Sequence, residues 1–146
     1  MGKVIVDSCV LTNSFQSDSV HRDASVAFID HFVRHALLIT MPAHGWFEVW
    51  CNIKRLSAVE RKYLHPVFAE TMQLPLELIH IDAQFISKYG NVSIPYTKAA
   101  DHIFIVVAFV NKYPLVTWDH KMIKVGKEVG VKVYKPNEYI SLLSRA

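Results

Sequence analysis

The chain has 146 residues, enough for one domain with a core of its own, and 51% of them are hydrophobic, a share that excludes intrinsic disorder. The longest unbroken apolar run, residues 103–110, is too short to span a membrane, and a carboxylate at Asp7 comes too early for a signal peptide. Two cysteines exclude a disulfide framework and an all-cysteine zinc site. We therefore expect a single domain over residues 1–146 in a reducing, cytoplasmic setting.

The net charge of +3 is unevenly distributed along the chain. Residues 1–110 carry nine basic and ten acidic side chains, whereas residues 111–146 carry seven basic and three acidic ones. A basic terminal quarter suits a polyanionic partner. A solvated lysine-rich face explains the same excess equally well.

Strands and helices are expected to alternate along the whole chain. In chain order, we expect a strand at 3–6, a helix at 20–35, a strand at 37–41, a helix at 43–56, a helix at 57–73, a strand at 76–81, a helix at 83–90, a helix at 97–112, a strand at 115–118, a helix at 120–129, a strand at 131–134 and a short helix from residue 136. This alternation predicts an α/β fold, a three-layer α/β/α sandwich around a mostly parallel central sheet.

Two of these helices depend on local signals. Ser57 and Glu60 have the spacing of a capping box, which predicts that a separate helix begins at Ser57, with Pro66 interrupting it. Residues 103–110 have strand propensity, but the length of the segment and a cap at Thr97 favour a helix, buried because it is apolar on every side.

Two acidic residues directly follow predicted strands. Asp7 follows the strand at residues 3–6, and Asp119 follows the strand at 115–118. Ligands of open α/β sheets bind beyond the carboxyl ends of the strands, so both residues are candidates for a site. Each also has an ordinary explanation, because Asp7 can close an Asx-turn and Asp119 can cap the next helix.

Two further acidic residues lie on predicted helices. Asp101 is in the first turn of the apolar helix, where a carboxylate complements the helix dipole or, in an enclosed setting, requires a cation. Glu48 shares one helical stripe with His44, Asn52 and Arg55. That stripe faces either the solvent or the ligand-binding region beyond the carboxyl ends of the strands, and the sequence alone leaves both possibilities open.

Four acidic motifs occur in one order across nearly the whole chain. They are Val4-Ile5-Val6-Asp7-Ser8, Glu48-Val49, Ala100-Asp101-His102-Ile103 and Leu115-Val116-Thr117-Trp118-Asp119. Together they resemble the acidic motifs of PIN-domain nucleases, and the length resembles that of the VapC-type toxins within that family. Two positions depart from the family pattern: Cys9, where Asn or Ser is more usual, and Trp118, where Arg is more usual. We expect Trp118 to be a buried core aromatic rather than a face for stacking bases.

The resemblance implies a PIN-like fold and a metal-dependent endoribonuclease that hydrolyses RNA phosphodiester bonds. Catalysis and binding of Mg²⁺ or Mn²⁺ would fall to one set of side chains: Asp7, Glu48, Asp101 and Asp119. Hard divalent cations prefer such oxygen ligands. Ser8 and Thr117 would orient the carboxylates by hydrogen bonds. Candidate contacts to RNA are Arg55, Lys98, Lys121 and Lys124.

The same resemblance implies partners beyond RNA. A VapC-type toxin has a small antitoxin protein that occludes its site and is commonly a homodimer, and no membrane is involved. A second interpretation is a catalytically inactive PIN-fold module for RNA binding or protein assembly, although the presence of all four acids argues against it. The absence of a Gly-rich phosphate-binding motif gives no support to a nucleotide cofactor.

Overall fold

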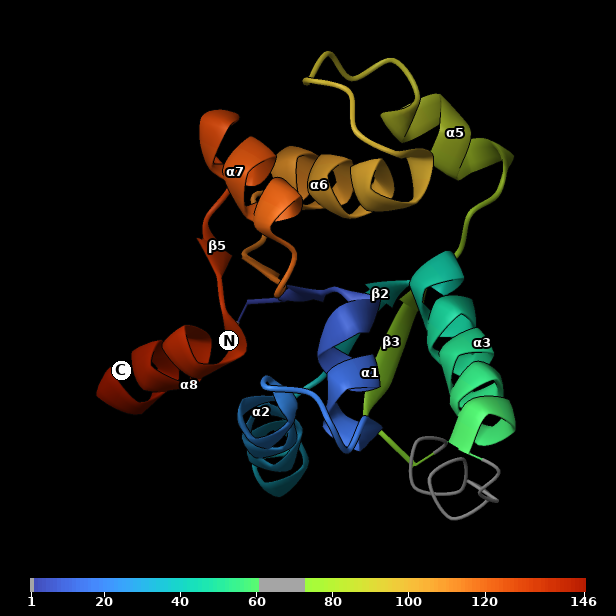
Figure 1. Cartoon of the computed structure of the whole chain (residues 1–146). Coiled ribbons are helices and arrows are strands. Elements are labelled where there is room, and N and C mark those ends of the chain that lie inside the picture. Colours follow the sequence, from blue (N-terminus) through green and yellow to red (C-terminus); the bar gives the residue numbers. More distant parts are fainter. Residues whose placement is uncertain (1, 61–72) are drawn as a thin grey trace.

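A sheet of five parallel strands runs through the middle of the protein, with helices on both of its faces (Figure 1). This computed structural model describes residues 2–60 and 73–146. The strands are β1 (Ile5–Val6), β2 (Ile39–Pro42), β3 (Leu76–Ile79), β4 (Leu115–Val116) and β5 (Val133–Tyr134), in the spatial order β3-β2-β1-β4-β5. The predicted α/β sandwich is confirmed, and every strand pair in the described residues is parallel.

The helices form two layers. They are α1 (Ser8–Phe15), α2 (Arg22–Arg34), α3 (Ala43–Glu60), α5 (Ala83–Tyr89), α6 (Ala99–Asn111), α7 (His120–Glu128) and α8 (Pro136–Arg145). Helices α1, α2, α3 and α8 lie on one side of the sheet, and α5, α6 and α7 lie on the other (Figure 1). No helix in the described part of the chain is long and apolar enough to cross a membrane.

The core forms where the β-branched strands meet α6. Val4, Ile5 and Val6 are buried, and β1 pairs with β2 on one side and with β4 on the other. Residues 104–108 of α6 are buried as well. The apolar segment is therefore a helix, as its length predicted, and it covers the sheet instead of joining it.

Four local expectations were wrong. Helix α1 was not expected, and α3 continues through residues 57–60, where the capping box predicted a new helix. Thr97 is buried and does not cap α6, whose N-cap is Lys98. The helix expected from residue 20 begins at Arg22, and Val20 lies before it and is 92% exposed. The remainder of the helix expected at 57–73, with its break at Pro66, falls within residues 61–72, outside the described part of the chain.

The direction of the connections changes between β1 and β4. The chain leaves β1 into α1 and α2 on one face, and leaves β4 into α7 on the other (Figure 1). Because these two strands are neighbours, the chain departs in opposite directions from their adjacent carboxyl ends. We use the word crevice for this place between the ends of β1 and β4. Such a switch point is where open α/β sheets bind ligands.

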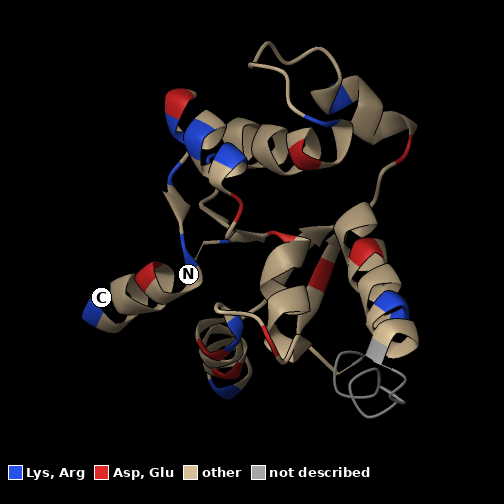
Figure 2. Cartoon of the chain, in the orientation of Figure 1, with Lys and Arg blue, Asp and Glu red and all other residues tan. Residues whose placement is uncertain are grey.

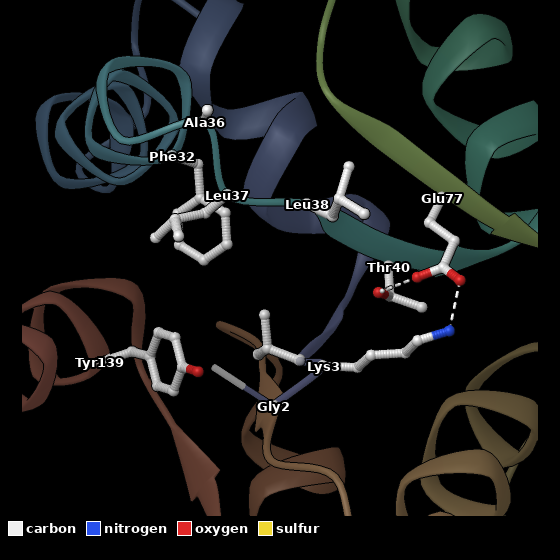
Figure 3. Close-up of a pocket in the computed structure, with 10 residues that line it drawn as sticks. Gly2, Lys3, Phe32, Ala36, Leu37, Leu38, Thr40, Glu77 and Tyr139 are labelled. Atoms are coloured by element: carbon white, nitrogen blue, oxygen red, sulfur yellow. Dashed lines mark hydrogen bonds and ion pairs between the residues drawn. The ribbon is translucent and has the colours of Figure 1, made fainter.

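The opposite edge of the sheet has a hollow of its own. Its volume is about 290 Å³, and Lys3, Thr40 and Tyr139 are among the residues that line it (Figure 3). Lys3 donates to Glu77, which also accepts from the Thr40 hydroxyl (Figure 3). This hollow lies where the strands begin, so it is separate from the crevice at their carboxyl ends.

Candidate active site

Asp7 lies at the carboxyl end of β1, and its side chain is almost fully buried. The Thr117 hydroxyl donates to its Oδ2 atom at 2.7 Å, and the Cys9 thiol donates to the same atom at 2.8 Å. Burial raises the pKa of Asp7 above the ordinary 3.8, and these hydrogen bonds only partly oppose that shift. Asp7 is the N-cap residue of α1, and its side chain makes no capping hydrogen bond there. A hydrogen bond from the backbone N–H of Cys9, two residues on, also lowers the pKa of Asp7, which is the pattern of an Asx-turn, so that explanation and a place in the site apply together.

Ser8 joins Asp7 to the second carboxylate, Glu48 on α3. Its hydroxyl donates to Glu48 Oε2 at 2.7 Å and lies 3.3 Å from Asp7 Oδ1. One turn further along α3, Asn52 donates to the Thr12 hydroxyl of α1 at 3.1 Å. The polar stripe of α3 therefore faces the protein at Glu48, whose carboxylate lies at the crevice, and at Asn52, whose partner belongs to α1.

Asp119 follows β4 and begins α7. Its Oδ1 atom accepts from the backbone N–H of Met122 at 2.8 Å, so the capping role considered from the sequence is real. The backbone N–H of Asp119 donates to the Thr117 hydroxyl at 2.9 Å. Thr117 is thus bonded to Asp7 through its hydrogen and to Asp119 through its oxygen, which fixes the strand ends relative to each other.

Asp101 reaches the crevice from the opposite helix layer, in the first turn of α6. Its pKa is raised above 3.8, mainly by burial and then by repulsion from Asp119 and Glu48. Lys98 and Lys121 act in the other direction. The structure therefore brings Asp101 within electrostatic reach of two other predicted ligands and of two of the four candidate RNA contacts.

The remaining candidate contacts lie further out. Arg55 and Lys124 are exposed, on α3 and α7. Figure 2 shows basic residues along α7 and acidic residues on α3 and α6. Lysines therefore occupy the helix that begins directly after Asp119.

The carboxylates are not gathered into a preformed metal cage. Within the described ranges, no three His, Cys, Asp or Glu side chains are close enough together to hold one ion. The donor set nevertheless fits Mg²⁺ or Mn²⁺, because these ions take hard oxygen ligands and Mg²⁺ keeps several waters while binding only one or two carboxylates. The repulsion that raises the pKa of Asp101 is relieved by a cation at this place.

Cys9 takes part in the site, although the sequence identified it only as a departure from the family pattern. Its thiol bonds to Asp7, its sulfur accepts from the backbone N–H of Trp118 at 3.4 Å, and burial followed by the charge of Asp7 raises its pKa well above 9.0. Its position two residues after Asp7, in the first turn of an unforeseen helix, was the only available signal. The thiol therefore stays protonated as a donor to the carboxylate.

Trp118 is half-buried, so the expected core role holds only in part. Its indole N–H donates to Ser25 at 2.9 Å, and the ring stacks on His21 with centroids 4.1 Å apart and planes 11° apart. His21 therefore occupies one face of the Trp118 ring, and Trp118 directly precedes Asp119 in the chain. The side chain secures α2 to the edge of the crevice.

Comparison with known proteins identifies the fold. No curated protein matches the chain. A solved domain of a functionally unknown protein from Methanocaldococcus jannaschii DSM 2661 is similar at 17% identity, with 92% of this chain and 91% of that chain covered and a TM-score of 0.48. The family model for the PIN domain matches residues 4–128, which include all four acidic residues of the crevice. The chain belongs to the PIN domain family.

Proposed function

We propose that this protein is a Mg²⁺- or Mn²⁺-dependent endoribonuclease that hydrolyses RNA phosphodiester bonds at the crevice between β1 and β4. PIN domains are generally nucleases, which supports hydrolysis of nucleic acid. The observation that carries the proposal is the placement of carboxylates from different elements at this crevice. Ser8 donates to Glu48 Oε2 and lies 3.3 Å from Asp7 Oδ1, and Thr117 donates to Asp7 while accepting from the backbone N–H of Asp119. Burial, followed by repulsion from Asp119 and Glu48, raises the pKa of Asp101 beside them. Such an arrangement is costly in a protein that never binds a cation.

Asp7, Glu48, Asp101 and Asp119 would hold the ion. When bound, the ion supplies positive charge that offsets the charge developing on the phosphate and favours ionisation of the attacking water. Thr117, Cys9 and Ser8 keep two of the carboxylates in fixed orientations by donating to them. Lys98 and Lys121, near Asp101, would attract the phosphates that flank the scissile bond.

The proposed chemistry is tested with end-labelled single-stranded RNA and a DNA strand of the same sequence. We expect cleavage of the RNA with Mg²⁺ or Mn²⁺, none in EDTA, and products with 5′-phosphate and 3′-hydroxyl ends, because water is the nucleophile. Cyclic 2′,3′-phosphate ends or full activity in EDTA would contradict the proposal. RNA binding without any cleavage would favour the inactive binding module.

We further propose that this activity is that of a cytoplasmic VapC-type toxin, held in check by a small antitoxin and acting as a homodimer. Expression in a bacterial host should arrest growth, and Asp101→Asn should abolish the arrest. Co-expression with the product of an adjacent small open reading frame should restore growth, and that product should co-purify with the chain. Light scattering of the purified protein should give the mass of two chains. Growth without any arrest would contradict the toxin role and leave the proposed nuclease chemistry unaffected.

A further inference from the structure

Among the residues that the structure describes, one direct hydrogen bond joins helices of the two layers beside the crevice. The Nε2 atom of His44, in the first turn of α3, lies 2.8 Å from the carbonyl oxygen of Ala100 in the first turn of α6. A carbonyl oxygen only accepts, so Nε2 carries the hydrogen. The other ring nitrogen, Nδ1, is buried and has no hydrogen-bond partner among the described residues. The contact therefore depends on a single atom of the imidazole.

The residue after His44 lets the two helices approach closely. Gly45 is buried, and a Cβ atom there would lie 2.6 Å from Cζ of Phe104 and 3.2 Å from Cγ of Met41. The His44 ring packs on the same Phe104 ring, with centroids 4.9 Å apart. Gly45, which weakens a helix by propensity, is thus required by packing, and the position of α6 against α3 is set by two consecutive residues.

Both ends of this contact are next to carboxylates of the crevice. Glu48 lies one turn after His44 on the same face of α3, and Asp101 directly follows Ala100. Glu48 and Asp101 come from opposite sides of the sheet and repel each other. A contact that holds Ala100 against His44 therefore also holds these two carboxylates at a set separation.

We infer that His44 is a positioning residue: its Nε2–H bond to Ala100 fixes the separation of Glu48 and Asp101 and thereby the affinity of the crevice for a divalent cation. This inference rests on the proposed metal-dependent function. It assigns His44 no contact with RNA or with the ion. Its role is carried entirely by one hydrogen and the ring contact behind it.

Glutamine and asparagine separate this role from general packing. The side-chain nitrogen of Gln reaches the place of Nε2, whereas that of Asn reaches only the place of Nδ1. We expect His44→Gln to bind Mn²⁺ within about threefold of wild type by titration calorimetry. His44→Asn should bind it at least about tenfold more weakly, at the lower end of what the removal of orienting partners costs metal sites. Cleavage of RNA should follow the same order.

A matched control lies two turns along the same stripe. Asn52→Ala removes a neutral hydrogen bond from α3 to α1 instead of α6. It should lower the melting temperature as much as His44→Asn while leaving Mn²⁺ affinity within about threefold of wild type. A loss of affinity equal to that of His44→Asn would show that loosening α3 is sufficient and would overturn the inference.

A spectroscopic measurement tests the bond without any metal or substitution. Nitrogen-15 spectra of the metal-free wild type should show the hydrogen of His44 on Nε2. Hydrogen on Nδ1 overturns the inference, as does equal Mn²⁺ affinity in His44→Asn and wild type. If the wild type binds no Mn²⁺ and cleaves no RNA, both the inference and the proposed function are overturned. If the wild type binds Mn²⁺ and cleaves RNA, and the His44 variants do so equally well, the inference alone is overturned.

Discussion

Replacing Thr117 by valine removes one hydroxyl without changing the shape of the side chain. Thr117 is fully buried, donates to the Asp7 carboxylate at 2.7 Å, and accepts from the backbone N–H of Asp119 at 2.9 Å. A hydrogen bond to a charged group contributes about 1.5–3 kcal/mol, and a buried donor left without an acceptor costs about 1–3 kcal/mol. Since Asp119 is only half-buried, we expect a total loss of about 2–4 kcal/mol at pH 7.

The corresponding change in melting temperature follows from the length of the chain. With about 2.1 cal/mol/K per residue, 146 residues give an unfolding entropy of about 0.3 kcal/mol/K. Thr117→Val should therefore melt about 7–13 °C below wild type. Thr117→Ser is the matched control, because it keeps the hydroxyl and removes one methyl group, which costs about 1 kcal/mol.

The penalty of Thr117→Val should depend on pH. The bond from Thr117 lowers the pKa of Asp7, so the wild-type advantage is fully present at pH values above that pKa, where the carboxylate is charged. The part of the advantage that comes from the charged carboxylate is lost as the pH falls through the pKa of Asp7, which burial holds above 3.8, whereas the part that comes from the Asp119 N–H remains. Urea unfolding at pH 7 and at successively lower pH measures this; a valine variant within about 0.5 kcal/mol of wild type at pH 7, or one as stable as the serine variant, would refute the reasoning.

Two further predictions concern the charges of the crevice and its surroundings. Asp101→Asn should abolish cleavage and the Mn²⁺-induced rise in melting temperature. In wild type that rise corresponds to about 1.4 kcal/mol of stabilisation at ten times the dissociation constant. The metal-free variant should be at least as stable as wild type at pH 7, because burial and repulsion from Glu48 and Asp119 raise the pKa of Asp101. Ionisation of Asp101 destabilises the folded protein only above pH 3.8, so the stability gained by the Asn variant should vanish as the pH falls below that value. A variant that is less stable than wild type at pH 7 and keeps its Mn²⁺ response would show a helix-dipole role instead. Changing Lys124 and Lys127 together to Gln should flatten the salt dependence of single-stranded RNA binding by about 0.7 in log–log slope for each phosphate that is no longer neutralised, and an unchanged slope would show that both are merely solvated.

The fold class was predictable because short, mostly apolar runs alternate with segments of helical period along the chain. What failed was local. Helix α1 carries Ser, Thr and Asn with one β-branched valine, a composition that favours turns as readily as helices, and its packing against α2 and α3 decides the outcome. At Ser57 a capping box was overridden, because Leu56 continues the buried stripe of Val49 and Ile53 at helical spacing.

The candidate site was predictable in its residues and unpredictable in its connections. Strand-terminal positions pointed to Asp7 and Asp119, because all parallel strands present their carboxyl ends at one edge. The partners Cys9 and Thr117 lie 108 residues apart in the chain, and both donate to the same carboxylate oxygen. No pattern within a short window of sequence contains that relation, so only the folded chain reveals it.

The bond between Asp7 and Thr117 has a consequence for synthesis of the protein on the ribosome. The two residues are 110 positions apart, so at about 5–20 residues per second the first carboxylate waits roughly 6–20 s for its partner. Until then β1 lacks β4, its neighbour on one side, and the site lacks Asp119. A nascent or truncated chain that stops before residue 119 therefore has no complete crevice, and the proposed hydrolysis of RNA would begin only with the finished domain.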